Sequence, residues 1–422
     1  MRVAVIGAGY VGLTLASVLA KFGNKVSLVE NDSAKLRGIR KGKPHFYEPG
    51  LGALLRRVLA NGSLTLFGEA SQLERNLDVI FIAVGTPSKK SGAVNLSAIW
   101  VVAREISSKI TPGQTVVVLK STSTPGTTRR LAEKVNSDIA FCPEFLREGH
   151  ALEDTLHPDR IIIGCERPKT AAILKRLFTD FKVPMLTMKI ESAELTKYAA
   201  NSYLALRIVF ANQLADLVQK AGADIKEVIS GIGLDRRIGS HYWYPGLGYG
   251  GSCFPKDVAA LAVWARKVGV KRSLFRKMDS LNRQRAGEKL AELEEVWGSF
   301  QGKRVAVWGL ACKQGTDDIR GSRAMEIIKI LCERKVKVTA FDYLAMEKAK
   351  NVLPSIDYKD DPYKAVKGAD VLLVLTDEPK FSKLSFERVK TLMRSNKVFD
   401  ARNILNRKIL IKLGFQYRGV GR

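Results

Sequence analysis

The first 22 residues carry the pattern that most restricts what this chain can fold into. The apolar run 3–6 ends in a glycine, and an apolar stretch with helical character follows from residue 10 onwards. Between them, Gly7, Gly9 and Gly12 form a GxGxxG motif. Such a motif between a buried strand and a helix lets the backbone approach a pyrophosphate, which the helix N-terminus binds. The pattern therefore predicts a doubly wound, dinucleotide-binding α/β domain.

Later strands of the same domain supply candidate cofactor contacts. The second predicted strand begins at residue 25 and ends at Glu30, about the distance at which an acid binds the adenosine ribose. A carboxylate there repels a 2′-phosphate, so the sequence favours NAD over NADP. The strands in "LDVIFIAVGTP" and "TVVVLKSTSTPGTT" end in small hydroxylated residues. Because ligands bind at the carboxyl edge of a parallel sheet, Thr86 and Thr122 are candidates for lining the cofactor cleft.

The opening pattern occurs a second time. From Lys303, "KRVAVWGLACKQGTDDIRGSRA" has the same order of strand, glycine turn and helix, and two later strands repeat as well. The full GxGxxG is missing, and a basic loop with Lys313 and Arg320 replaces it, so we expect a phosphate-bearing ligand other than NAD. A long helical stretch, 192–222, lies between the repeats. The predicted fold is thus α/β, with two Rossmann-like doubly wound domains joined by a long central helix.

The composition excludes several other classes of protein. The 422 residues carry a formal net charge of +27, but the cations are spread along the chain without a basic tail or an RNA-binding signature. We therefore expect a solvated basic surface that attracts anionic nucleotides, and no nucleic-acid partner. Five scattered cysteines without a CxxC pair, and four histidines without metal-ligand spacing, predict neither a disulfide framework nor a metal site. No signal peptide or bilayer-spanning run is recognisable, so we expect a cytoplasmic protein with no membrane partner.

One segment, "GLGYGGSCFPKD" at 246–257, surrounds a thiol with glycines and follows it with two opposite charges. A structural cysteine in a tight loop is one interpretation. The other is a nucleophile, with a bare backbone that gives a bulky substrate access to Cys253. In this interpretation Lys256 stabilises the thiolate and Asp257 takes or orients a proton. A thiol in a nicotinamide-binding protein predicts oxidation through a covalent adduct: an aldehyde becomes a thiohemiacetal, then a thioester, then an acid.

Ten motifs in order make the chain similar to a known family, the nucleotide-sugar dehydrogenases. They are "GAGYVGL", "FIAVGTP", "KSTSTPGT", "PEFLREG", "PDRIIIG", "AELTKYAANSYLA", "RIG", "GYGGSCFPKD", "GLACKQGTDDIR" and "DARNI". The resemblance implies NAD-dependent, four-electron oxidation of the C6 alcohol of UDP-glucose to UDP-glucuronate, through a thiohemiacetal and a thioester on Cys253. It also implies a homodimer with the long helix at its interface. The implied domains are an NAD-binding Rossmann domain (1–190), a central helical linker and dimerisation domain with the catalytic cysteine loop (191–295), and a UDP-sugar-binding Rossmann-like domain (296–422).

The resemblance assigns roles to individual residues. Lys197 and Asn201, which share one helix face, would stabilise negative charge at C6, and Glu144 would act as acid and base in thioester hydrolysis. The implied catalytic residues are Cys253, Lys197, Asn201, Asp257, Glu144 and Thr122. The implied cofactor-binding residues are Gly7, Gly9, Tyr10, Val11, Gly12, Glu30, Lys35, Thr86, Thr122, Glu148, Lys256 and Arg320. The implied substrate-binding residues are Glu144, Phe145, Leu146, Arg147, Glu148, Lys197, Asn201, Arg237, Tyr242, Tyr244, Gly246, Gly250 and Lys313, with Arg237 crossing to the neighbouring subunit.

Three alternatives share part of this pattern. A dehydrogenase for a UDP-N-acetylhexosamine (UDP-ManNAc or UDP-GlcNAc) would use the same nucleophile, but "PEFLREG" resembles the glucose branch, because the amino-sugar branch typically has arginine directly after that glutamate. A hydroxyacid dehydrogenase performs one oxidation and needs no thiol. A nucleic-acid-binding protein on the same fold has no need of Cys253, Lys197, Asp257 and Glu144 together. One departure from the family pattern, Cys142 in place of asparagine, adds a second thiol near the predicted site.

Overall fold

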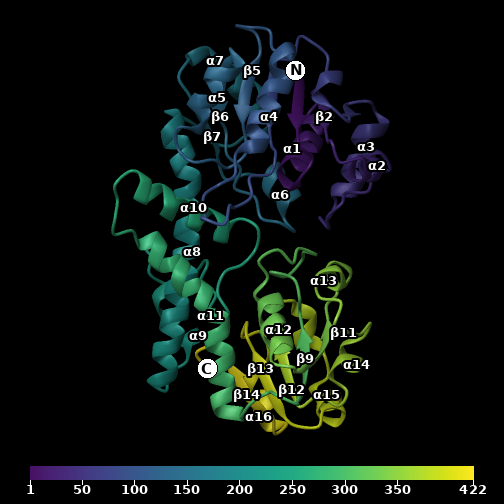
Figure 1. Ribbon diagram of the computed structural model, residues 1–422, viewed down its shortest axis with the longest axis vertical. Coiled ribbons are helices and arrows are strands. Elements are labelled where there is room, and N and C mark those ends of the chain that lie inside the picture. The colour runs from purple at the N-terminus through teal and green to yellow at the C-terminus, as the bar shows by residue number, and fades with distance from the viewer. The chain divides into compact units, whose positions relative to one another are not determined.

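The computed structural model describes all residues, 1–422, and they form two compact units (Figure 1). The first unit comprises residues 1–200 and 263–270. The second comprises residues 201–262 and 271–422. None of the helices combines the length and the apolar character needed to span a lipid bilayer.

The first unit is built on an eight-stranded sheet. Its strands are β1 (Arg2–Ile6), β2 (Lys25–Val29), β3 (Leu64–Phe67), β4 (Val79–Ile82), β5 (Val116–Leu119), β6 (Asp138–Phe141), β7 (Ile161–Cys165) and β8 (Met185–Met188), in the order β3-β2-β1-β4-β5-β6-β7-β8. All neighbours are parallel except β6 and β7, which pair antiparallel. Because the strand order reverses between β1 and β4, a crevice for ligands is expected at their carboxyl ends.

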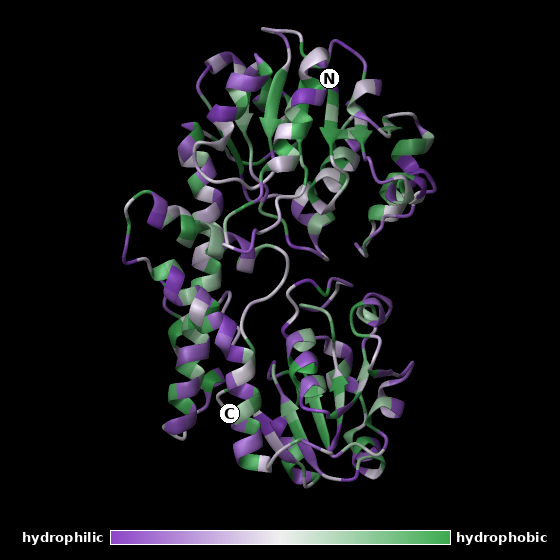
Figure 2. Ribbon diagram, viewed as in Figure 1, coloured by the Kyte–Doolittle hydropathy of each residue, from purple (hydrophilic) through white to green (hydrophobic).

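Helices cover both faces of this sheet. Val3 and Val5 of β1 pack into one apolar core with the helices α1 (Tyr10–Lys21), α3 (Leu51–Ala60) and α7 (Pro168–Leu177). Ala4 and Ile6 point the other way, into a core with α4 (Ser97–Ile106) and α5 (Thr127–Val135). Strands that are buried on both faces are continuous apolar runs, which Figure 2 shows as green arrows. The shorter helices of the unit are α2 (Ser33–Arg40), α6 (Ala151–Leu156), η1 (Ala70–Gln72), η2 (Ser107–Lys109) and η3 (Thr179–Phe181).

The second unit repeats the plan of the first. Its six strands, all parallel, are β9 (Arg304–Trp308), β10 (Lys337–Phe341), β11 (Asp357–Tyr358), β12 (Val371–Val374), β13 (Lys397–Asp400) and β14 (Gln416–Gly419). Their order, β11-β10-β9-β12-β13-β14, matches β3-β2-β1-β4-β5-β6. The repeat read from the sequence is therefore confirmed. Its sheet carries α12 (Arg323–Glu333), α13 (Met346–Val352), α14 (Pro362–Val366), α15 (Phe386–Leu392), α16 (Arg407–Lys412) and η4 (Pro379–Lys383).

The helices of the middle of the chain connect the repeats. The longest, α8 (Ile190–Lys220), has 31 residues and begins in the first unit and ends in the second. It is followed by α9 (Ile225–Gly233), α10 (Phe254–Lys267) and α11 (Leu274–Trp297). Ala286, Leu290 and Leu293 of α11 pack into the same core as β9 and α12. The predicted fold class, two doubly wound α/β domains joined by a long helix, is confirmed.

Candidate active site

Among the three glycines of the turn after β1, only Gly9 leaves room for a ligand. A Cβ on Gly12 would lie 1.8 Å from the carbonyl oxygen of Gly7, so this glycine lets α1 approach the strand closely. A Cβ on Gly9 would meet no atom within 4 Å. Gly9 therefore faces open space directly before α1, where N–H groups without helical partners attract a phosphate. The turn fits the pyrophosphate of NAD.

Glu30 lies at the carboxyl end of β2, beside this turn. Its buried carboxylate accepts hydrogen bonds from the backbone N–H of Ala8 (3.1 Å) and of Asp32 (3.0 Å). These bonds fix the acid next to the turn, as the ribose-binding prediction requires. Lys35 pairs with Asp32 at 3.6 Å, and the ring of Tyr10 stacks on Phe46 with 3.8 Å between the centroids.

The predicted threonines lie together at the ends of β4 and β5. The hydroxyl of Thr86 donates to the backbone carbonyl oxygen of Thr122 at 3.0 Å. Adjacent parallel strands bring their carboxyl ends to the same edge of the sheet, where both threonines are predicted to line the cofactor cleft.

Glu144 and Lys197 form a buried ion pair in the first unit. Glu144 follows β6, and its Oε1 lies 2.9 Å from Nζ of Lys197 on α8. The backbone N–H of Leu146 donates to the other carboxylate oxygen at 2.8 Å. Burial alone would raise the pKa of Glu144, but the Lys197 ammonium, the Leu146 N–H and Lys120 together hold that pKa below its ordinary value. Glu144 is therefore an ionised base at neutral pH.

The other members of "PEFLREG" surround this pair in different ways. The Lys197 ammonium lies 5.3 Å from the centre of the Phe145 ring, whose other contact is the Arg160 guanidinium at 3.9 Å. Arg147 donates twice to Asp154 and is largely exposed, whereas Glu148 is buried.

Cys253 lies at the start of α10 in the second unit. The backbone N–H of Asp257 donates to its carbonyl oxygen at 2.9 Å, and the thiol is partly exposed. A sulfur at the positive end of a helix is stabilised as the thiolate. Lys256, predicted to stabilise the thiolate, donates to Asp257 at 2.6 Å, and Asn201 of α8 donates to the second oxygen of the same carboxylate at 2.6 Å. Asp257 is buried and held from both sides.

Two of the glycines before Cys253, Gly248 and Gly250, are required by close packing. We expected a bare backbone that gives a substrate access to the sulfur. In the structure, Gly248 has a φ of +95° and its added Cβ would lie 2.5 Å from Oδ1 of Asn282. A Cβ on Gly250 would lie 2.3 Å from the carbonyl oxygen of Gly321. At these two positions neighbouring parts of the second unit occupy the space, so close packing requires glycine.

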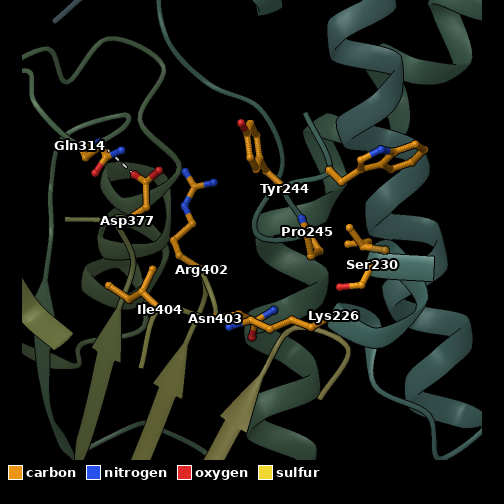
Figure 3. A pocket seen from close by; sticks show the side chains of 11 residues that line it. Lys226, Ser230, Tyr244, Pro245, Gln314, Asp377, Arg402, Asn403 and Ile404 are labelled. Atoms are coloured by element: carbon orange, nitrogen blue, oxygen red, sulfur yellow. Dashed lines mark hydrogen bonds between the residues drawn. The ribbon is translucent and has the colours of Figure 1, made fainter. Parts of the chain in front are cut away.

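The segment before these glycines borders a cavity of about 440 Å³. Figure 3 shows Gln314, Asp377 and Arg402 on one side of the cavity, and Tyr244, Pro245 and Ser230 on the other. Gln314, Asp377 and Arg402 follow β9, β12 and β13, so the cavity lies at the carboxyl edge of the second sheet, where ligands bind in such folds. Arg402 contributes a guanidinium that suits an anionic nucleotide.

The remaining predicted substrate residues have these positions. Tyr242 has a φ of +64°, and its ring lies 5.6 Å from that of Tyr244. Gly246 donates its N–H to Asn212 at 2.7 Å. Lys313 is half-buried in the loop next to Gln314. Arg320 binds Asp318 through two nitrogens, and Arg237 binds Asp235 while its side chain stays 87% exposed.

Three charged residues of the folded protein were not predicted from the sequence. Asp342 follows β10 and accepts from the N–H groups of Leu310 and Ala311, as Glu30 does after β2; its position in the repeat was the signal. Glu194 of α8 is fully buried and accepts from Thr128, and burial raises its pKa. Arg402 stands in the quoted motif "DARNI", but only the folded sheet places it at a cavity.

Three family models match the chain. They describe the UDP-glucose/GDP-mannose dehydrogenase family: its NAD binding domain matches residues 1–182, its central domain residues 191–284, and its UDP binding domain residues 306–407. The chain belongs to the UDP-glucose/GDP-mannose dehydrogenase family. The predicted resemblance is therefore confirmed. The chain is an NAD-dependent oxidoreductase with an NAD-binding domain and a separate UDP-binding domain, as predicted.

Named relatives span the whole length of this family member. UDP-glucose 6-dehydrogenase YwqF of Bacillus subtilis is 38% identical over 431 residues, which cover 100% of this chain and 98% of YwqF. The UDP-glucose 6-dehydrogenase of Pseudomonas aeruginosa is 37% identical, with coverage of 100% and 98%. Among solved structures, a UDP-glucose dehydrogenase from Pyrobaculum islandicum has a TM-score of 0.92 at 37% identity (100% and 98% covered). A UDP-D-ManNAc dehydrogenase from Pyrococcus horikoshii has 0.87 at 29% (100% and 99% covered).

Proposed function

We propose that this dehydrogenase oxidises the C6 alcohol of UDP-glucose to the carboxylate of UDP-glucuronate, with Cys253 as a covalent nucleophile. The observation that carries the proposal is a partly exposed thiol at the N-terminus of α10, beside a carboxylate held by an ammonium and an amide, in a chain that has an NAD-binding domain. A dehydrogenase that stops after one oxidation has no use for such a thiol.

The reaction needs two oxidations and one hydrolysis. The C6 alcohol loses a proton and a hydride to become an aldehyde, and NAD+ bound at the glycine turn supplies the hydride acceptor for both oxidations. The Cys253 thiolate adds to the aldehyde carbon and gives a thiohemiacetal, which loses a second hydride and a proton to give a thioester. Water then attacks the thioester carbon, and the thiol leaves as the acid forms.

The polar residues described above have separate roles in this series of steps. Lys197 and Asn201 are four apart on α8 and share one face, from which they donate hydrogen bonds to the oxygen that becomes negative at C6. Glu144 is an ionised base that accepts a proton from the attacking water, with Thr122 as a water-positioning residue. Asp257 accepts the proton of the thiol or of the alcohol.

UDP-glucose is favoured over a UDP-N-acetylhexosamine by the relatives. Those named UDP-glucose 6-dehydrogenase reach 38% identity, against 29% for the solved UDP-D-ManNAc dehydrogenase. Phe145, which follows Glu144 directly, takes the place where the amino-sugar branch typically has arginine. The cavity near Tyr244 and Arg402 supports binding of the UDP part in the second unit.

We infer a homodimer in the cytoplasm as the working form. Tyr203, Phe210 and Leu217 recur every seven residues on α8 and are 58%, 50% and 64% exposed, so they form an apolar stripe on the surface of the monomer. A second copy of this helix would cover the stripe. Arg237, whose side chain is mainly in solvent, would then reach the site of the other subunit. The five free thiols suit a reducing compartment.

The experiment is a panel of UDP-sugars with excess NAD+, in which NADH and the sugar product are both quantified. We expect two NADH per UDP-glucose and UDP-glucuronate as the product. Two NADH from UDP-ManNAc or UDP-GlcNAc, with UDP-glucose inert, would leave the mechanism standing and replace the substrate. One NADH per sugar, with an aldehyde as the final product, would overturn the covalent mechanism.

A further inference from the structure

Helix α11 buries polar side chains on the face that it turns to the cysteine loop. Asn282 is 3% exposed and Arg285 is 4% exposed, and the two are three residues apart, so they lie on one side of the helix. Burying an amide or a guanidinium costs free energy unless every polar atom finds a partner. Each of these two residues has a partner in the segment 246–249, directly ahead of Cys253.

Asn282 holds both backbone groups of one residue. Its Oδ1 accepts from the N–H of Tyr249 at 2.8 Å, and its Nδ2 donates to the carbonyl oxygen of Tyr249 at 3.0 Å. The side-chain amide thus makes the two hydrogen bonds to Tyr249 that a neighbouring β-strand would otherwise make. Gly248 lies directly against it, since an added Cβ would be 2.5 Å from the same Oδ1. The contact leaves the backbone no space to shift towards α11.

Arg285 binds the backbone of the same segment at its first residue, Gly246. Its Nε donates to the carbonyl oxygen of Gly246 at 3.1 Å, while the N–H of Gly246 donates to Asn212 of α8 at 2.7 Å. A second nitrogen of the guanidinium binds the Asp216 carboxylate, which Lys289 also contacts at 2.8 Å. Both backbone groups of Gly246 are therefore bound by buried side chains.

We propose that Asn282 and Arg285 are positioning residues that fix the segment 246–249 and thereby set the place of the Cys253 sulfur. Only three residues separate Tyr249 from Cys253, and α10 begins on the other side of the thiol. The sulfur is held between a clamped segment and a helix end. The inference rests on the proposed function only for the role of Cys253 as nucleophile, because the clamp itself is a property of the second unit.

The test compares Asn282→Ala with Asn24→Ala. Asn24 is also buried and donates to a backbone carbonyl, that of Leu19 at 3.0 Å, but it lies in the first unit, away from any predicted site residue. Two quantities are measured in each: kcat with UDP-glucose, and the rate at which iodoacetamide alkylates Cys253, followed by peptide mass. We expect Asn282→Ala to lower kcat about tenfold, since a small displacement of a reacting atom has effects of this size, while the KM for NAD+ stays within about twofold.

The alkylation rate of Cys253 should rise about threefold in Asn282→Ala, because a loosened segment exposes the sulfur more often. Asn24→Ala should lose stability and leave both quantities within about twofold of the parent. The proposal is overturned if either quantity in Asn282→Ala stays within that range. Should Asn282→Ala not fold, Asn282→Asp removes the bond to the Tyr249 carbonyl oxygen alone, and Arg285→Lys removes the bond to Gly246; the same two criteria apply. If the parent oxidised no UDP-sugar, the proposed function would be refuted. The alkylation rates would still show whether Asn282 and Arg285 fix the segment 246–249.

Discussion

At the scale of single residues, the charge state of the site depends on pairs. Glu144 is buried, and burial by itself disfavours its ionised form. The Lys197 ammonium at 2.9 Å is the strongest influence against burial, and with the Leu146 N–H and Lys120 it holds the pKa of the carboxyl below its ordinary value. The Asp257 carboxylate likewise accepts hydrogen bonds from two partners, Lys256 and Asn201. A change at one member of a pair will therefore alter the chemistry of the other.

The thiol itself gives the most direct test at this scale. Cys253→Ser should form no UDP-glucuronate, because a serine hydroxyl at the same place is a far weaker nucleophile towards the aldehyde. We expect at most one NADH per sugar, measured with a chromatographic assay for the acid. Cys332→Ser is the matched control: this thiol is also partly buried, burial raises its pKa, and it belongs to no predicted site. UDP-glucuronate from Cys253→Ser at the parental rate would rule out the covalent route.

Replacing Lys197 should change how stability depends on pH. In the parent the pKa of Glu144 is lowered, so its contribution to stability is complete above the ordinary glutamate pKa and is lost as the pH falls through the lowered value. In Lys197→Met the ammonium that opposes burial most strongly is lost, so the pKa of Glu144 rises and its ionised carboxylate is less well stabilised at neutral pH. We expect the variant to lose about 3–5 kcal/mol at pH 7, the cost typical of breaking a buried pair, and clearly less at pH 4.

Urea unfolding at both pH values measures this difference. Lys220→Met, at the exposed end of α8, is the control and should show no pH-dependent loss. An equal loss of stability for Lys197→Met at pH 4 and pH 7 would mean that the charge of Glu144 does not depend on Lys197.

At the scale of elements, different parts of the α8 surface face the core of the first unit, the core of the second unit and the solvent. Its first turns carry Glu194 and Lys197 into the core of the first unit, its last turns place Ala215 in the core of the second, and a third face carries the exposed apolar stripe. Because its residues are apolar on several sides, the helix has no single hydrophobic face. This is the expected pattern for an element that is covered on more than one side.

The stripe on α8 predicts how the proposed dimer can be separated. In Tyr203→Lys combined with Leu217→Lys, two ammonium groups replace apolar side chains that a second copy would bury, and desolvating them without partners is costly. We expect a monomer by light scattering at concentrations where the parent is a dimer. Val101→Lys on α4 replaces a similarly exposed apolar side chain (41%) and should leave the dimer intact. A dimer that survives the double replacement must use another surface.

The elements also explain which features the sequence could predict. The glycine turn, the repeat and the long helix have local periodicity, so they were predicted, and Thr86 and Thr122 could be placed at the same sheet edge because parallel strands align their ends. Asn282 lies 33 residues from its partner Tyr249 and stands in an ordinary helical stretch. The sequence shows that positions 248 and 250 are glycines, but it does not show which atoms occupy the space beside Gly248 and Gly250. Contacts of this kind exist only after the chain has folded.

At the scale of the whole molecule, one plan has been used twice with different results. Both sheets have the same strand order, and Glu30 and Asp342 bind the turn after the first strand in the same way. In the second unit, however, Ala311 occupies the position that corresponds to Gly9, so a methyl group stands where the first turn leaves open space. The dinucleotide should therefore bind only the first unit, while the second takes a ligand with its phosphates elsewhere.

This difference predicts separate responses to the two ligands. NAD+ at 100 times its dissociation constant stabilises the unit that binds it by about 2.7 kcal/mol, which corresponds to a rise of roughly 5–10 °C in the unfolding midpoint of a 200-residue unit. In scanning calorimetry we expect NAD+ to raise one transition and UDP to raise the other, because each sheet has apolar cores of its own on both faces. Gly9→Ala is the control variant: its Cβ meets no protein atom within 4 Å, so the fold should persist, but the methyl group occupies the space over the turn and should remove the NAD+ shift while the UDP shift remains. If NAD+ moved both transitions equally in the parent, the two units would unfold as one and the ligands could not be assigned to separate sheets in this way.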